Sequence, residues 1–312
     1  MKKISIQWNK YGLVFAFVIW CVVVTILEPA FLTTSNLLNV LRQISIVSVI
    51  AIGAFLAILT GGIDLSVGSV AALAGVVAAI LMKRFNMAVA WGIMGGVLIG
   101  ALIGAANGIM ITKMKMAAFI ATLITMNFAK GLAFIFTDGV PISGLPSPFV
   151  FLGRGYLWFL PFPIVIMAAV FLVTGWVMRQ TRFGMRVYGI GGNPEAVRLS
   201  GVNVHRYLQI VYLVSGAAAG LGGVLLASRL DSGTPNVGET YVFDAITAVV
   251  LGGTSLAGGS GRVVGVFLGS IFMGTLGNGL NLLNVPSYWQ LIAKAVLLAV
   301  AVSIDIRAKN EK

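Results

Sequence analysis

Apolar residues occur along this chain in long runs that are separated by short polar segments. A helix needs about 20 mainly apolar residues to cross a hydrocarbon core of about 30 Å, and most of the runs approach this length. The pattern therefore predicts an all-α polytopic membrane protein with about ten membrane-embedded helices. The runs cover residues 11–27, 44–60, 65–82, 87–111, 117–137, 157–178, 207–227, 242–251, 263–280 and 288–304.

Composition agrees with this pattern. Hydrophobic residues make up 59% of the 312 residues and charged residues only 10%, whereas soluble domains carry about 25% charged residues. Little of the chain is left for a soluble domain, so we expect a single transmembrane domain over residues 1–312 with one larger polar connection at about 179–206. The lone Cys21 lies inside the first run and offers neither a disulfide nor a metal site.

Basic residues fill the short polar segments, which explains the net charge of +12 without nucleic acid as a partner. Cytoplasmic loops of membrane proteins are enriched in Lys and Arg. If the run at 242–251 crosses and both termini are cytoplasmic, fourteen of the 21 Lys and Arg lie inside, five lie outside, and Lys130 and Lys294 fall within spans. This bias predicts cytoplasmic termini and a crossing, although Lys83 and Arg84 oppose it. The outside set is Arg42, Lys83, Arg84, Arg154 and Arg229, and the inside set is Lys2, Lys3, Lys10, Lys113, Lys115, Arg179, Arg182, Arg186, Arg198, Arg206, Arg262, Arg307, Lys309 and Lys312.

The run at 242–251 is too short for an ordinary span, and a glycine-rich stretch follows it at 252–261. It predicts a short, broken or re-entrant helix. Residues 61–69 (GGIDLSVGS) align with residues 252–260 (GGTSLAGGS) and match at five of nine positions. Paired interruptions of this kind point to a transport pathway, and chance similarity between glycine-rich stretches is the open alternative.

The glycine-rich stretch lacks the motif of a phosphate-binding loop. Gly253 and Gly258 have the first spacing of that motif, but Gly259 and Ser260 follow without the lysine that must reach the phosphates. A single histidine, a single cysteine and the lack of an evident acid pair argue against a hydrolase or a metal enzyme. We therefore expect no catalytic residue, no metal and no cofactor bound by this chain.

Several polar residues fall within or beside the apolar runs. Asp64 would cost about 2.5 to 3.5 kcal/mol at the bilayer centre, so we expect it either as the N-cap of the third helix or beside a wet pathway. Asp244 is predicted to open the short eighth helix and has the same two interpretations. Lys130 and Lys294 can each extend towards an interface or point into the bundle. The candidate pathway residues are Asp64, Ser66, Asn107, Asn127, Asn278, Asn281 and Lys294. Hydrogen bonding between helices is the commoner use of such amides.

The polar connection at 179–206 contains the pattern of a short capped helix. Asn193 can cap a helix whose first residue is Pro194. Glu195 complements the positive end of this helix, and Gly201 can close it in the left-handed conformation. A helix of about seven residues is marginal alone in water, so either this chain's own bundle or another subunit should pack against it.

The segment from Glu195 to Gly201 (EAVRLSG) resembles the EAA-type loop of ATP-binding-cassette importer permeases, with Val197 in place of the last alanine. Together with residues 59–69 (LTGGIDLSVGS) and 250–259 (VLGGTSLAGG), it makes nearly the whole chain similar to the ribose-type monosaccharide permeases. The resemblance implies that the family's coupling helix maps onto residues 193–201. The residues that would contact the ATPase are Asn193, Pro194, Glu195, Ala196, Arg198, Leu199 and Gly201.

The resemblance also implies the partners and the function. It implies a multi-pass subunit of the bacterial inner (plasma) membrane, surrounded by membrane lipid, that pairs with a second permease subunit as a homodimer or heterodimer. A cytoplasmic ATPase would use ATP and magnesium to drive it, and an extracytoplasmic binding protein would deliver the sugar. The expected function is import of a monosaccharide such as ribose by alternating access. A stand-alone proton-coupled or facilitative sugar carrier and a membrane scaffold or channel component are the alternatives.

Overall fold

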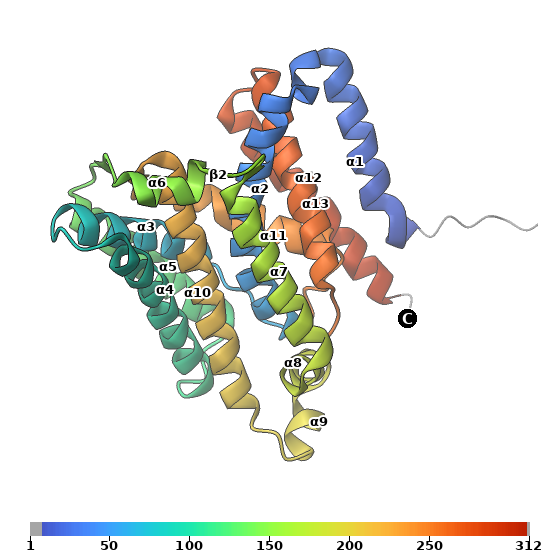
Figure 1. The fold of residues 1–312 in the computed structure, drawn as a ribbon. Coiled ribbons are helices and arrows are strands. Elements are labelled where there is room, and N and C mark those ends of the chain that lie inside the picture. The colour runs from blue at the N-terminus through green and yellow to red at the C-terminus, as the bar shows by residue number, and fades with distance from the viewer. Residues whose placement is uncertain (1–7, 311–312) are drawn as a thin grey trace, which may run out of the picture.

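A computed structural model describes residues 8–310, and nearly all of their regular structure is helical (Figure 1). Six of the helices have the length and hydropathy to cross a membrane. The chain is therefore an all-α polytopic membrane protein, as predicted. These six helices are α2 (Thr34–Leu59), α4 (Val89–Thr112), α5 (Ala118–Thr137), α7 (Phe162–Gln180), α10 (Val204–Leu230) and α12 (Val263–Leu282). Lys2, Lys3 and Lys312 lie outside the described residues.

Further helices complete the bundle or lie at its ends. The bundle also contains α1 (Trp8–Leu27), α3 (Val67–Lys83), α11 (Gly238–Leu251) and α13 (Ser287–Asn310). The shorter helices are η1 (Pro29–Leu32), α6 (Ser147–Arg154), α8 (Arg182–Gly192) and α9 (Pro194–Leu199). Two antiparallel pairs of two-residue strands join β1 (Ile142–Ser143) to β4 (Ser232–Gly233) and β2 (Tyr156–Leu157) to β3 (Leu160–Pro161). Figure 1 shows α6 at one end of the bundle and α9 at the other, and we call these ends the α6 side and the α9 side.

The core lies around α2, in which every residue from Ile44 to Leu59 is buried. Helices α4 and α10 approach each other closely through glycine. A Cβ added to Gly100 would lie 2.3 Å from the carbonyl oxygen of Gly216. Glycines at the contact let the two backbones touch, which is a common way to pack helices in membranes.

Helix α2 begins at Thr34, ten residues before the predicted span. Hydrogen bonds of polar side chains hold its first turns, because Asn36 Nδ2 donates to the Phe31 carbonyl and to Asn278 Oδ1, both at 2.9 Å. An apolar run marks only the part of a helix that apolar groups surround, so it missed this polar beginning. It missed α8 for the same reason, and it missed α6 because that helix has only eight residues.

The prediction that Asp64 caps the third helix is wrong. Helix α3 begins at Val67, and the cap position is held by Ser66, whose side chain makes no capping bond. Asp64 Oδ1 instead accepts hydrogen bonds from Ser66 N at 3.0 Å and Ser66 Oγ at 2.6 Å, which closes the turn before the helix. The prediction that Asp244 opens the eighth helix is also wrong, because α11 begins at Gly238 and Asp244 lies within it. Both errors arise because composition does not locate the turn that precedes a helix.

The eighth element runs from the α6 side to the α9 side as a non-helical segment followed by a short helix. On the α6 side, the Asp231 carboxylate accepts a hydrogen bond from Leu145 N at 2.8 Å. Helix α11 then starts at Gly238, and the loop after it donates from Gly259 N to the Leu59 carbonyl at 2.9 Å on the α9 side. The predicted short helix is present, with bounds 238–251 instead of 242–251.

The two aligned glycine stretches end their helices in the same way. After α2 and after α11, the first residue past the C-cap donates three residues back, at 2.9 Å in both cases. The next residue donates five residues back, at 3.1 Å after α2 and 3.2 Å after α11, which completes a Schellman motif. The left-handed residues are Gly61 (φ +80°) and Gly253 (φ +81°). Gly61 therefore corresponds to Gly253 and not to Gly252, so the predicted alignment is shifted by one residue.

Candidate functional site

Helix α9 projects from the bundle on the α9 side (Figure 1). Asn193 Oδ1 accepts a hydrogen bond from Ala196 N at 3.0 Å, and Pro194 is the first helical residue. Gly201 follows the helix with φ +83°. The predicted helix, its cap and its left-handed end are present, and a role of these residues in coupling stays a prediction.

No residue of α9 is buried by the rest of this chain, and the Leu199 side chain is 78% exposed. Glu195 and Arg198 form an ion pair on the helix surface, with Oε1 and Nη2 2.5 Å apart. The hydrogen bond from Arg198 lowers the pKa of the Glu195 carboxyl, so this carboxyl is ionised at neutral pH. Of the two alternatives for its partner, this chain's own bundle covers the helix only at Val197, which is half-buried against Gly189 of α8.

Five glycines meet where the ends of α2 and α8 contact the loop after α11. We call Gly61, Gly191, Gly192, Gly258 and Gly259 the glycine junction. A Cβ on Gly191 would lie 1.9 Å from the Leu59 carbonyl oxygen and 2.3 Å from Gly259 N. Because α8 leads directly into α9, this junction links the exposed helix to the backbone of both interrupted elements.

Replacing Gly191 with alanine should destabilise the protein by about 1–3 kcal/mol, because the new methyl group would overlap backbone atoms of two neighbouring segments. Gly192→Ala is the matched control, since no atom lies within 4 Å of its added Cβ. We expect it to change the stability by less than about 0.5 kcal/mol. Thermal unfolding in detergent measures both, and equal melting temperatures would contradict the close contact.

Three predicted pathway residues belong to one buried hydrogen-bond network. Asp64 Oδ2 accepts from Ser215 Oγ of α10 at 2.7 Å. Ser66 Oγ accepts from Asn107 Nδ2 of α4 at 3.0 Å, and Asn107 Oδ1 accepts from Thr125 Oγ1 of α5 at 2.6 Å. This Asp64 network ties the turn before α3 to three helices. The sequence did not indicate Ser215 or Thr125, because single hydroxyls are common in apolar runs.

Lys294 points into the bundle and pairs with Asp244. Its Nζ lies 2.7 Å from Asp244 Oδ1 and 3.0 Å from Oδ2, and the side chains are 10% and 8% exposed. The pair joins α13 to α11. Lys130 makes a different pair, with Glu239 of α11, and both of those side chains are exposed. The two interpretations that the sequence left open therefore apply to different lysines: Lys294 points into the bundle, and Lys130 is exposed.

The remaining predicted amides lie apart from these groups. Asn278 bonds Asn36 on α2, and Asn281 Oδ1 accepts from Gln290 Nε2 of α13 at 2.8 Å, so both join helices. Asn127 is exposed on α5, where its Nδ2 donates to the Leu123 carbonyl at 3.0 Å. The structure thus brings Asp64, Ser66 and Asn107 together and leaves the other four candidates separate.

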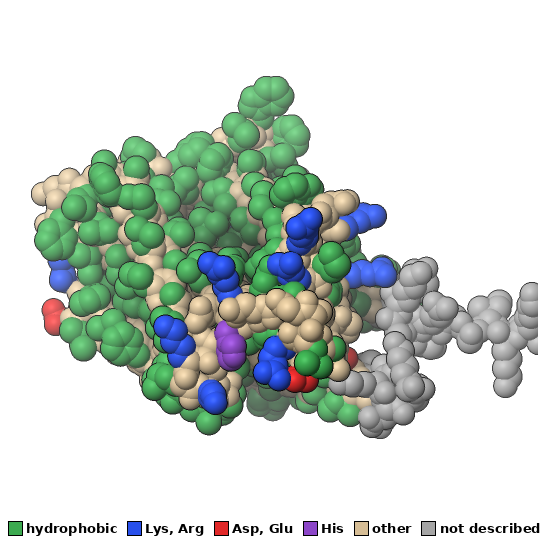
Figure 2. Space-filling view, turned by 90° about the horizontal axis from the view of Figure 1, so that it is seen from below, with side chains coloured by type: hydrophobic (Ala, Val, Ile, Leu, Met, Phe, Trp, Pro, Cys, Tyr) green, Lys and Arg blue, Asp and Glu red, His purple; other side chains and the backbone are tan. Residues whose placement is uncertain are grey.

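Basic side chains divide between the two ends of the bundle. Figure 2 looks onto the α9 side and shows Lys and Arg spread around the single histidine. On the α6 side, Arg154 Nε donates to the Arg229 carbonyl at 2.7 Å, and Arg42 donates to the Arg154 carbonyl at 3.4 Å. These three arginines belong to the set predicted to lie outside.

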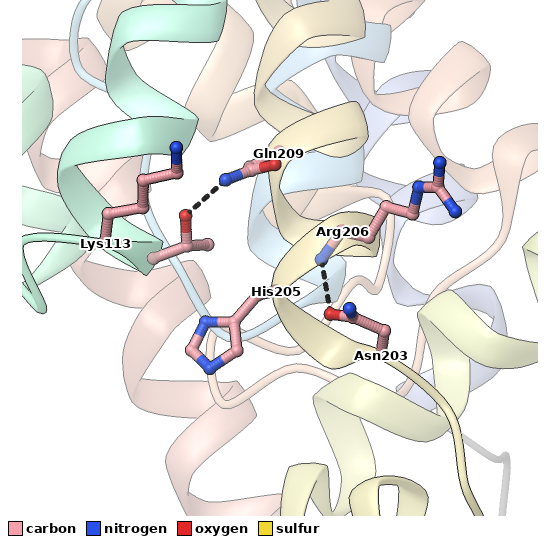
Figure 3. Close-up of a pocket in the computed structure, with 6 residues that line it drawn as sticks. Lys113, Asn203, His205, Arg206 and Gln209 are labelled. Carbon is pink, nitrogen blue, oxygen red and sulfur yellow. Dashed lines mark hydrogen bonds between the residues drawn. The ribbon is translucent and has the colours of Figure 1, made fainter.

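A pocket of about 410 Å³ opens between α4 and α10 on the α9 side. Its lining includes Lys113, His205, Arg206 and Gln209, and Gln209 Nε2 donates to Thr112 Oγ1 at 2.8 Å. Figure 3 shows the Arg206 guanidinium pointing away from Lys113 and His205, so the charges do not converge on one ligand position. Within residues 8–310, no group of His, Cys, Asp and Glu could hold a metal ion.

A bundle of apolar helices with two similar interruptions and an uncovered capped helix at one end has the architecture of a membrane permease. The family model described as branched-chain amino acid transport system, permease component, matches residues 36–301, and the chain belongs to this family. No solved structure shows a significant match to the chain.

Relatives with curated names are similar over nearly their whole length. The ribose import permease protein of Bacillus subtilis is 46% identical over 300 residues, which are 95% of this chain and 92% of that protein. The ribose import permease protein of Escherichia coli K12 is 44% identical, over 93% of this chain and 91% of its own. The L-arabinose transport system permease protein of the same strain is 37% identical, over 96% and 90%.

Proposed function

We propose that this chain is the membrane-spanning permease subunit of an ATP-driven importer of ribose or a similar monosaccharide. The observation that carries the proposal is the uncovered helix α9, capped by Asn193 and ending in an exposed Leu199, in a chain whose relatives are named ribose import permeases. Ten segments cross the membrane, nine as single helices and the eighth as a non-helical segment followed by α11, and the whole chain forms one permease domain. Import proceeds by alternating access.

The partners follow from the same assignment. A cytoplasmic ATPase docks on α9 and hydrolyses ATP with magnesium. This chain itself is therefore no enzyme and binds no cofactor. An extracytoplasmic sugar-binding protein docks on the α6 side, and a second permease subunit completes the path. The α9 side and both termini face the cytoplasm of a bacterial cell, because basic residues gather on the α9 side.

Reconstitution into liposomes tests the function. We expect ribose uptake only when the ATPase, the binding protein and ATP are all present. Ribose uptake driven by a proton or sugar gradient in this chain alone would contradict the proposal and support a stand-alone carrier. Leucine and isoleucine serve as comparison substrates because the family description names branched-chain amino acids, and their uptake in place of ribose would reassign the substrate.

The role of α9 predicts that Leu199→Asp weakens binding of the ATPase at least about tenfold, since a buried carboxylate in the interface would lose its water. The measurement is co-purification of the ATPase with the permease in detergent. Trp158→Asp is the control, because Trp158 is 91% exposed on the α6 side and should not touch the ATPase. Unchanged co-purification of the Leu199 variant would contradict the docking assignment.

A further inference from the structure

Two charged side chains meet on an open surface of an otherwise apolar bundle. Lys130 on α5 forms an ion pair with Glu239 on α11, and their side chains are 42% and 69% exposed. The buried pair of Asp244 and Lys294 is at most 10% exposed. Thus one of the two ion pairs that join helices in the described part of the chain is open to whatever surrounds the bundle.

The open pair lies well inside the membrane-embedded length of its helices. Lys130 precedes Thr137, the last residue of α5, by two helical turns, which places it about 10 Å below the α6-side end. Glu239 lies beside Gly238, which packs against Gly68 near the start of α3 and about 20 Å from the α6-side end of that helix. A hydrocarbon core of about 30 Å would enclose the pair.

Further exposed polar side chains surround the pair. Asn127 lies one turn before Lys130 on the same face of α5, and Thr240 follows Glu239 on α11. Phe243 is 54% exposed one turn after Glu239. We call Asn127, Lys130, Glu239 and Thr240 the polar surface, and Phe243 borders it.

Lipid is a poor neighbour for this surface. A charged side chain at the bilayer centre costs about 2.5 to 3.5 kcal/mol, and such residues face water or other protein groups. The exposed apolar residues of α7, by contrast, suit lipid. Leu172 is 73% exposed and Val173 is 61% exposed.

We propose that the polar surface lines the water-filled path of the transported sugar. Sugar hydroxyls both donate and accept hydrogen bonds, and the surface offers an acceptor in Glu239, a donor in Lys130 and both in the amide of Asn127. Phe243 provides an apolar ring for the C–H face of the sugar. The inference rests on the proposed function for its ligand. It adds Glu239 and Thr240, which the sequence did not suggest, and it assigns a role to Lys130, for which the sequence left two interpretations open.

Cysteine labelling tests whether this surface is wet. In full-length protein with Cys21→Ala, single variants Asn127→Cys and Thr240→Cys are treated in membrane vesicles with a charged methanethiosulfonate reagent. Leu172→Cys is the control, because it is exposed and lies as many residues from the α6-side end of α7 as Asn127 lies from that of α5. We expect both test positions to react at least about tenfold faster than the control, since the reagent modifies thiols only in water.

The outcomes separate this inference from the proposed function. Equally slow labelling at all three positions overturns the inference, and a disulfide between two Asn127→Cys chains would then show that a second copy covers the surface. In the reconstituted importer, ribose should slow labelling at position 127, and fast labelling that ribose leaves unchanged during active import overturns the sugar contact. Fast labelling without any sugar import leaves the wet surface standing and contradicts the proposed function alone.

Discussion

Replacing Lys294 with methionine should destabilise the protein by about 3–5 kcal/mol, because Asp244 would stay buried without its partner. The two groups lie 2.7 Å apart, and burial by α11 and α13 keeps water from replacing the lysine. The loss is measured by thermal unfolding in detergent, and the signal is the amount of protein that stays monodisperse. The variant should melt well below the parent protein.

Two further variants show whether the loss comes from the unpaired charge. The double variant Asp244→Asn, Lys294→Met should recover most of the stability, since removing both charges of a buried pair is often neutral. Lys130→Met is the matched control from the exposed pair and should change the stability by no more than about 1 kcal/mol. A Lys294 variant that melts with the parent protein would show that the pair contributes nothing.

The second large effect is expected at Asp64, the centre of the Asp64 network. Asp64→Ala removes the acceptor of three hydrogen bonds, two from Ser66 and one from Ser215. A buried donor that loses its acceptor costs about 1–3 kcal/mol, and three donors lose their acceptor here, so a total loss of at least about 3 kcal/mol is expected. The melting temperature in detergent is again the measurement.

Asp64→Asn is the matched variant because it keeps the shape and one acceptor oxygen. The Ser215 hydroxyl can turn to accept from the new amide, so we expect a loss of about 1 kcal/mol. Equal damage from asparagine and alanine would show that the negative charge, and not the hydrogen-bond geometry, holds the turn before α3. In that case the network would have to be assigned a different role.

The pattern of apolar runs located the bundle helices because each of them must bury or immerse its apolar side chains. It placed the first and fifth helices to within three residues at either end. It failed at the polar start of α2 and at α6 and α8, where side-chain hydrogen bonds and contacts between distant segments form the helix. The sequence predicted α9 correctly, because Asn193, Pro194 and Gly201 begin and end the helix through the backbone of adjacent residues.

The sequence by itself determined the membrane class, the approximate positions of the apolar helices, the short eighth helix and the capped helix at 194–199. Each of these depends on residues that are close together along the chain. Only the tertiary structure decided that Asp244 holds Lys294, that Ser215 reaches Asp64, and that Lys130 and Glu239 meet on an open surface. Those contacts join residues that are 50 or more positions apart, and their partners follow from how the helices pack, which no local pattern records.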